Sequence, residues 1–333
     1  MWKLTTCFGE RQRHEDRLLA DAVLGTFGEH RLATSLLLRA AAGFGLRHHL
    51  RTDETLTMSE DPSMMAVAVD ERARLEPVVE RVLGIQQRGL VTVERLHHAP
   101  DVPDSVEVQL TVHLGRDERI GGGPSYVVVC ELLRRHGVAG ASVLVGVDGT
   151  SRGRRERARF FARNRTVPAM VVAVGSSERV RTVVPELQRL LPEAVVTVER
   201  VRICKRDGAL LAGPSGVAGP GAWQRLTVYS SEHHLVGGEP LHRAIVRRLR
   251  AGDTRGVTVL RGAWGFHGEH APHGDRFWQL GRRVPVVTTV VDTPDRVARA
   301  FVVVDELTVA HGLVTTELVP RAVSPGYSNF GGR

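Results

Sequence analysis

The sequence predicts an α+β protein of three tandem βαββαβ units, each with the ferredoxin-like arrangement of a four-stranded antiparallel sheet covered on one face by two helices. Short landmarks recur at separations of 106 and 116 residues, and each repeat alternates strand-like with helix-like segments. The third strand of the later repeats is also apolar at nearly every position. Both faces of each sheet must therefore be covered.

The clearest landmark is a strand-like segment that ends in glycine, at residues 35–43, 141–149 and 257–265. Further landmarks stay in phase within two residues. They are Leu4-Thr5, Leu110-Thr111 and Leu226-Thr227; Pro62, Pro168 and Pro285; and Thr92-Val-Glu94, Thr197-Val-Glu199 and Thr315-Thr-Glu317. Unrelated domains would not keep these landmarks in phase, so one unit of about 100 residues was triplicated.

The second unit shows its elements most plainly. Alternation predicts a strand over 109–114, and Pro124 opens a helix that ends at the basic residues and glycine of 134–137. The remaining expectations are a strand over 141–147, a loop over 148–166, a strand over 169–174, a helix from 176 and a strand over 195–201.

The third unit repeats this order, with elements at 225–230, 240–250, 257–263, 286–291, 294–307 and 313–319. The first unit keeps fewer signals, and Asp16 is the candidate cap of its first helix. These patterns place the units at residues 1–98, 106–204 and 223–321. Linkers are expected at 99–105 and 205–222, and a loose tail at 322–333.

The third strands show how the units should assemble. Residues 170–174 and 286–291 are apolar throughout, whereas the two helices of a unit cover only one sheet face. Three sheets can cover the other faces by turning them toward a common axis. A single chain would then be its own trimer.

Composition narrows the class of protein. The 333 residues are 42% hydrophobic and 25% charged, as in folded soluble proteins, and no apolar run reaches the roughly 18 residues of a membrane span. We therefore expect a cytoplasmic protein. Cys7, Cys130 and Cys204 form no Cys-x-x-Cys pair and are expected to be buried thiols. The net charge of +8 favours an anionic partner.

The motifs resemble those of the PII-like family catalogued as domain of unknown function 190. In the second unit the resemblance rests on residues 114–119, 121–124 and 136–149. In the third unit it rests on Gly237-Gly-Glu-Pro240 and residues 261–266, and in the first on Phe8-Gly-Glu10, Gly43-Phe-Gly45 and Ser59-Glu-Asp-Pro62.

The resemblance implies a unit that normally assembles from three identical chains and binds ligands in clefts between neighbours, near the loop that joins strands two and three. PII-like proteins mostly sense adenine nucleotides or related metabolites and regulate a transporter or enzyme, and members of this family often accompany membrane ion exporters. Here one monomeric chain would form an intramolecular PII-like pseudo-trimer.

Two departures from the PII pattern limit what is carried over. Tyr126, Tyr229 and Tyr327 all lie outside the expected loops, so tyrosine modification is not expected. The lysines that such proteins place around phosphate are also missing, because the chain has only Lys3 and Lys205. Arginine would have to bind phosphate instead.

The loop of the second unit is the first candidate site. Residues 151–165 hold seven arginines, and Gly149 before them would let backbone N–H groups approach an anion. We predict that Gly149, Arg152, Arg154 and Arg155 bind phosphate. A solvated charge run is the alternative. Nucleic-acid contact through Phe160 and Phe161 is not favoured, because no nucleic-acid module surrounds the run.

The loop of the third unit is the second candidate. His267, His270 and His273 stand three residues apart, and with Glu269 they could bind zinc or copper. Flanking glycines and Pro272 favour a floppy loop instead, so His267 and His270 are predicted as polar ligand contacts. Gly43, Gly45 and Gly265 complete the predicted ligand loops, unless they are only turn residues.

No known catalytic motif occurs, so we expect a non-enzymatic protein without a cofactor. The leading hypothesis is a signalling protein that binds an anionic metabolite of the adenine-nucleotide class between units and regulates a transporter or enzyme. The alternatives are a ligand-free interaction scaffold and a metal-binding protein built on the histidine loop. No nucleic-acid partner is expected.

Overall fold

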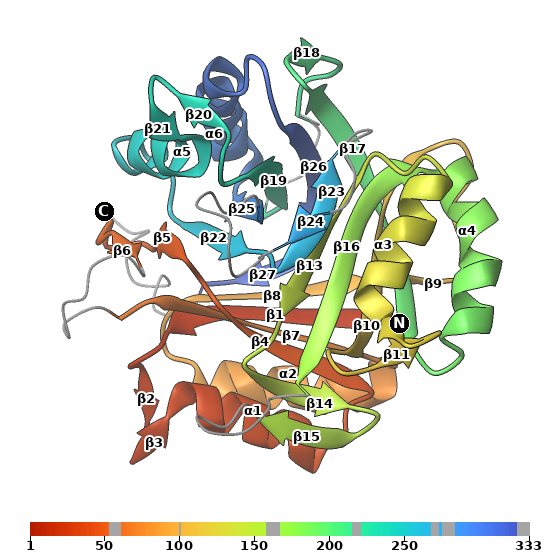
Figure 1. The fold of residues 1–333 in the computed structure, drawn as a ribbon. Coiled ribbons are helices and arrows are strands. Elements are labelled where there is room, and N and C mark those ends of the chain that lie inside the picture. Colours follow the sequence, from red (N-terminus) through yellow and green to blue (C-terminus); the bar gives the residue numbers. More distant parts are fainter. Residues whose placement is uncertain are drawn as a thin grey trace.

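A computed structural model describes residues 1–52, 61–99, 101–157, 167–214, 221–267, 273–274 and 284–324. Within these residues the protein has a mixed α+β fold with six helices, grouped with their sheets into three layered bodies around a common centre (Figure 1). No helix in the described part is both long and apolar enough to span a bilayer.

The second unit has the predicted order of elements. They are β10 (Glu107–Gly115), α3 (Ser125–Arg135), β13 (Gly140–Val145), β16 (Pro168–Ser176), α4 (Ser177–Leu190) and β17 (Val195–Arg206). The strands lie in the order β13-β16-β10-β17, and every neighbouring pair is antiparallel. Alternate residues of β10, such as Leu110 and Val112, pack with Leu133 and Val183 of the helices in one core.

The other two units have the same order and pairing. The first consists of β1 (Trp2–Gly9), α1 (Leu19–Glu29), β4 (Thr34–Arg39), β7 (Ser63–Asp70), α2 (Arg72–Ile85) and β8 (Leu90–Arg95). The third consists of β19 (Trp223–Ser231), α5 (Leu241–Arg250), β22 (Val257–Arg261), β25 (Pro285–Asp292), α6 (Pro294–Leu307) and β26 (Leu313–Val319). A two-stranded hairpin precedes the first helix of each unit: β2 and β3 (Arg13–His14, Arg17–Leu18), β11 and β12 (Arg119–Ile120, Gly123–Pro124), and β20 and β21 (Leu235–Val236, Glu239–Pro240).

The helix starts differ from the sequence prediction in two places. Pro124 does not occupy the first helical position, because its extended ψ of 131° makes it the N-cap and α3 begins one residue later. Asp16 does not cap α1, whose N-cap is Leu18 without a side-chain hydrogen bond. The Ser176 side chain does cap α4, since it accepts a hydrogen bond from the Arg179 N–H.

Short strands that follow the second strand of each unit join neighbouring units. β14 (Asp148–Ser151) pairs with β4, β5 (Ala42–Phe44) pairs with β22, and β23 (Trp264–His267) pairs with β13. The predicted loop over 148–166 is therefore wrong at its start, where β14 also pairs with β15 (Arg154–Arg157). Its residues 158–166 lie outside the described part. The other short strands here are β6 (Arg51–Thr52) and β24 (His273–Gly274).

A second set of pairings follows the last strand of each unit. β9 (His97–His98) pairs with β17, the end of β17 pairs with β26, and β27 (Arg321–Val323) pairs with β8. The linker expected from residue 205 therefore begins inside β17 and includes β18 (Ala209–Leu210). Likewise, the tail expected from residue 322 begins inside β27.

The sheet faces opposite the helices meet in a shared core. This core draws on all three units, with Leu36, Leu38, Ala40, Leu144, Met170, Val172, Val174, Val201, Ile203, Tyr229, Leu260, Val287 and Leu313. The first eight residues of β16 are all buried, which agrees with a strand covered on both faces. All three cysteines are free, and Cys130 and Cys204 are buried as expected whereas Cys7 is partly exposed.

The repeated glycine landmark has a structural reason. A Cβ on Gly43, Gly149 or Gly265 would lie 2.1–2.3 Å from a carbonyl oxygen of the neighbouring unit, namely that of Val257, Ser35 or Ala141. Real Cβ atoms do not approach backbone oxygen so closely. Only glycine therefore allows the short strands to pair across the unit boundary at this distance.

We expect Gly149→Ala to lower the free energy of unfolding by about 1–3 kcal/mol, because β14 must move away from β4 to make room for the methyl group. Gly45→Ala is the matched control, since nothing lies within 4 Å of a Cβ at that position. Urea denaturation would measure both changes. Equal effects of the two substitutions would contradict the close-approach explanation.

Candidate functional site

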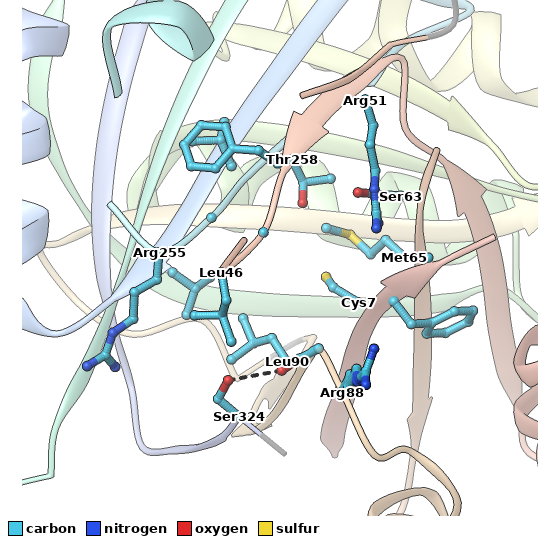
Figure 2. Close-up of a pocket in the computed structure, with 18 of the residues that line it drawn as sticks. Cys7, Leu46, Arg51, Ser63, Met65, Arg88, Leu90, Arg255, Thr258 and Ser324 are labelled. Carbon is cyan, nitrogen blue, oxygen red and sulfur yellow. Dashed lines mark hydrogen bonds between the residues drawn. The ribbon is translucent and has the colours of Figure 1, made fainter. Parts of the chain in front are cut away.

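The larger cavity, of about 870 Å³, lies between the first and third units. Its walls come from β1, β8 and the segment after β5 in the first unit, and from the starts of β19 and β22 and the end of β25 in the third (Figure 2). Because β5 pairs with β22, the Gly45–Arg51 segment that follows β5 lies over one side of the cavity.

The polar lining of this cavity is strongly cationic. One aspartate, Asp61, stands against six arginines: Arg11, Arg47, Arg51, Arg88, Arg225 and Arg255. Arg51 pairs with Asp61 at 3.2 Å. Arg47 and Arg88 are exposed and form no ion pair within the described part of the chain. The cavity thus has guanidinium groups that an anion could engage.

The floor of the cavity is apolar. Phe44, Met65 and Leu90 contribute to it, and Leu46 adds apolar surface from the segment after β5; Leu46, Met65 and Leu90 are labelled in Figure 2. Cys7 also lines the cavity, but burial raises the pKa of its thiol to about 11, so it stays protonated and is a poor nucleophile. An apolar floor with arginines around it suits a ligand that joins a ring to an anionic group.

A second cavity, of about 560 Å³, lies between the second and third units. Its described lining contains no arginine or lysine, and it gathers four histidines and one aspartate instead: His233, His234, His267, His311 and Asp207. The ring of His234 stacks on that of His311 with centroids 4.5 Å apart. Burial and the neighbouring imidazoles lower the pKa of His234 to about 4, so this ring is neutral at pH 7.

The predicted arginines lie on the boundary between the first and second units, outside the lining of both cavities. Arg155 Nη2 contacts Asp148 Oδ2 at 2.6 Å and Asp21 at 3.3 Å, and Arg152 contacts Glu118 at 3.5 Å and Glu193 at 3.3 Å. Arg154 is exposed on β15. Two of the three guanidinium groups are thus already paired with carboxylates.

Of the remaining predicted residues, three line a cavity. Gly45 lines the larger one, whereas Gly43 and Gly149 lie in the inter-unit strand pairs. Gly265 and His267 line the second cavity, where His267 Nε2 lies 2.7 Å from Asp207 Oδ1. His270 lies outside the described residues, and for His273 only the backbone is described. The metal hypothesis for this loop therefore stays a prediction.

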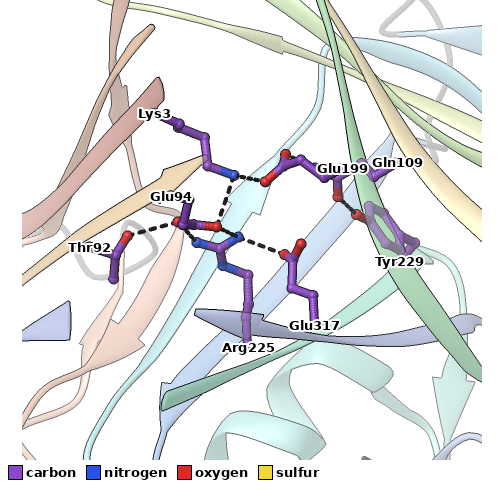
Figure 3. Close-up of polar contacts among 8 residues, drawn as sticks. All are labelled: Lys3, Thr92, Glu94, Gln109, Glu199, Arg225, Tyr229 and Glu317. Carbon is purple, nitrogen blue, oxygen red and sulfur yellow. Dashed lines mark hydrogen bonds and ion pairs between the residues drawn. The ribbon is translucent and has the colours of Figure 1, made fainter. Parts of the chain in front are cut away.

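The sequence analysis did not identify a third feature, which we call the axial cluster: Lys3, Glu94, Glu199, Arg225 and Glu317 (Figure 3). These side chains are 4–11% exposed. They occupy equivalent positions in the three units, because Lys3 pairs in register with Glu94, Gln109 with Glu199 and Arg225 with Glu317. The three carboxylates converge where the units meet.

The axial cluster is held by ion pairs, of which Arg225–Glu94 and Lys3–Glu199 join different units. Arg225 Nη2 lies 2.5 Å from Glu94 Oε1, Arg225 Nη1 lies 2.6 Å from Glu317 Oε1, and Lys3 Nζ lies 3.3 Å from Glu94 Oε2 and also contacts Glu199. Three acidic oxygens lie within 4.8 Å of one another, as at a cation site. Here two cationic side chains supply the positive charge.

A sequence signal for this cluster did exist. Glu94, Glu199 and Glu317 are the last residues of the Thr-x-Glu landmark that marks the fourth strand of each unit. The landmark identified the repeat, but its role required knowing that the fourth strands meet at one centre. The arginines of the larger cavity carried no local signal, because they come from five separate segments.

We expect Arg225→Met to lower the free energy of unfolding by about 3–5 kcal/mol, because it leaves Glu94 and Glu317 buried without their main partner. The matched control is Arg72→Met, which removes the exposed pair with Glu76 and should cost at most about 1 kcal/mol. Guanidinium chloride denaturation measures both. A loss for Arg225→Met no larger than that of the control would show that the cluster does not hold the units together.

Comparison with known families gives three matches to one model. The model is DUF190, described as an uncharacterized ACR, and it matches residues 1–98, 107–203 and 223–321. The three matches correspond to the three structural units and together cover most of the chain.

Proposed function

Because the chain belongs to the DUF190 family, whose model matches it in three successive stretches, we propose that it is a non-enzymatic regulatory protein of the PII-like kind. In this proposal each unit is ferredoxin-like, and the three units form an intramolecular pseudo-trimer. Support comes from the strand order β13-β16-β10-β17 and its two counterparts, and from inter-unit pairings that link every unit to both others.

The ligand of the proposal is an anionic small metabolite of the adenine-nucleotide class, bound in the larger cavity. The observation that carries this choice is the pair of exposed arginines Arg47 and Arg88, which form no ion pair within the described part of the chain, beside an apolar lining. Guanidinium groups bind phosphate oxygens through paired N–H donors, which would compensate for the scarcity of lysine. A volume of about 870 Å³ is sufficient for a nucleotide.

The cavity also offers a route from ligand to partner. Arg47 and Arg51 belong to the segment that follows β5, so a ligand phosphate that binds them would fix this segment against the cavity. The ordered segment would then present a different surface to a transporter or an enzyme. We assign no catalytic residue, since the one thiol in the described lining is kept protonated by burial.

The larger cavity replaces the arginine-rich segment 151–165 of the second unit as our preferred phosphate site. Arg152 and Arg155 would have to leave four carboxylates before they could bind an anion. Arg47 and Arg88 need no such exchange within the described part of the chain. A direct protein-docking role without a ligand remains the second candidate, and the same experiment separates the two.

We expect ATP, ADP or AMP to raise the melting temperature of the protein and to bind with an affinity measurable by calorimetry. Arg47→Ala and Arg88→Ala should each weaken binding by roughly 10- to 100-fold, because a hydrogen bond to a charged group contributes about 1.5–3 kcal/mol. The exposed Arg134 on α3 supplies the matched control, Arg134→Ala, which should leave the affinity unchanged.

Absence of binding by all three nucleotides at millimolar concentration would reject the proposal. Binding that Arg47→Ala, Arg88→Ala and Arg134→Ala weaken equally would reject the assigned cavity. A partner that is captured equally well with and without nucleotide would favour the scaffold.

A further inference from the structure

The axial cluster contains more acid than base. Glu94, Glu199 and Glu317 carry three negative charges when ionised, whereas Lys3 and Arg225 supply two positive charges. In the second unit, the position equivalent to Lys3 and Arg225 is occupied by Gln109, which is neutral. Fully ionised, the cluster would hold one unbalanced negative charge in a site where every charged side chain is at most 11% exposed.

An unbalanced buried charge is costly, and taking up one proton removes it. The contacts indicate which carboxyl takes that proton. Glu94 accepts two hydrogen bonds from Arg225 and one from Thr92, and Glu317 accepts one from Arg225. Glu199 forms an ion pair only with Lys3, which also pairs with Glu94, and it accepts a hydrogen bond from the neutral amide of Gln109.

The pKa values agree with this assignment. Burial raises the pKa of Glu199 to about 7, with a further contribution from Glu317 and Glu94 that Lys3 does not cancel. Burial acts on Glu94 in the same direction, but Arg225 and Lys3 outweigh it and lower the pKa of Glu94 to about 2. Glu199 is therefore the group that titrates near neutral pH.

Four charged side chains of the axial cluster act on Glu199. Lys3, Glu94, Arg225 and Glu317 face it from β1, β8, β19 and β26. On β10, burial and Lys3 lower the pKa of His113 to about 4, so His113 is neutral near pH 7. The strand β9 pairs with β17, but the side chains of its His97 and His98 are exposed.

Hydrogen bonds connect the cluster to both cavities. Arg225 itself lines the larger cavity, and Tyr229 lines the second. The Tyr229 hydroxyl donates to Gln109 Oε1 at 2.6 Å, and Gln109 Nε2 donates to Glu199 Oε2 at 3.0 Å. A continuous chain of buried and partly buried polar contacts thus runs from one cavity to the other through Glu199.

We propose that the axial cluster is a binding site for one exchangeable proton, carried by Glu199, and that its occupancy sets the hydrogen bonding of Tyr229 in the second cavity. Glu199 Oε1 faces Lys3, so the proton resides on Oε2 beside Gln109. A protonated Oε2 donates to the amide oxygen of Gln109, and this requires the amide to turn over. The amide N–H then donates to the Tyr229 oxygen, and the Tyr229 O–H, which keeps its proton, turns to donate toward the cavity.

The linkage has a definite sign. The pKa of Glu199 is higher in the folded protein than its ordinary value of 4.5, so the folded state binds the extra proton. The stability that this proton contributes is fully present below about pH 4.5 and is lost as the pH rises through about 7. His113 and His234, whose pKa values are lowered to about 4, act in the opposite direction, so the contribution of Glu199 is obtained as a difference. The melting temperature of the wild-type protein minus that of Glu199→Gln should fall between pH 5 and pH 8.

The test follows the proton directly in the ligand-free protein, so its outcome is independent of nucleotide binding. Infrared spectra recorded from pH 5 to pH 8 should show the C=O stretch of one buried protonated carboxyl group, which disappears with a midpoint near pH 7. Glu199→Gln should remove this band, and the difference in melting temperature between the wild-type protein and this variant should decrease from pH 5 to pH 8. A wild-type protein without the band, or a variant that keeps it, would overturn the proposal.

Two substitutions at one position provide matched controls. Gln109→Lys adds the third positive charge, as Lys3 does in the first unit, so Glu199 should ionise and the band should vanish. Gln109→Met removes a donor without adding charge, so the band should persist to higher pH. Retention of the band in Gln109→Lys would contradict the charge balance. If that variant does not fold, Glu199→Gln and Gln109→Met still decide.

The transmission to the second cavity has its own readout. With ¹³C-labelled tyrosine, the Tyr229 resonance, assigned with Tyr229→Phe, should shift with the same midpoint as the infrared band. It should not shift over this pH range in Glu199→Gln. A Tyr229 resonance that stays constant while the band titrates would show that the proton does not reach the cavity.

Discussion

Mutual burial of three sheet faces is the constraint on which the rest of this structure depends. Each unit covers one face of its sheet with two helices and leaves the other face apolar. The shared core of residues such as Leu36, Val172 and Val287 exists only when the units close on one another. The strand pairs across the unit boundaries then satisfy edge groups that would otherwise be open.

Fusion of the units in one chain lets equivalent positions carry different residues. The axial position of the first strand is Lys3, Gln109 or Arg225, and the position four residues later is Cys7, His113 or Tyr229. Of the latter, Cys7 lines the larger cavity and Tyr229 the second. Three identical chains would have to repeat one choice three times. Here one cavity is rich in arginine and another in histidine, although both form at equivalent kinds of boundary.

The same asymmetry leaves the axial cluster with one more acidic than basic side chain. Three equivalent glutamates remain, but only two of the three positions opposite them are cationic. Because Arg225 and Tyr229 both belong to β19, the cluster lies between the two cavities rather than beside one of them. The packing of the units and the proposed proton site therefore involve the same buried side chains, one of which, Arg225, also lines the cavity of the proposed ligand.

The sequence by itself determined the triplication, the order of elements in each unit and the need to cover both sheet faces, because these depend on local periodicity and on short landmarks. It also marked Gly43, Gly149 and Gly265, and the Thr-x-Glu motifs, without giving their roles. Only the tertiary structure decided that the glycines face a neighbour's carbonyl groups and that the glutamates converge with Lys3 and Arg225. It also showed that Arg152 and Arg155 are paired with carboxylates, and that the arginine-rich cavity lies between the first and third units instead. Most of these features depend on contacts between residues of different units, such as Gly149 with Ser35 and Arg225 with Glu94, and no local pattern records which distant side chain will meet another.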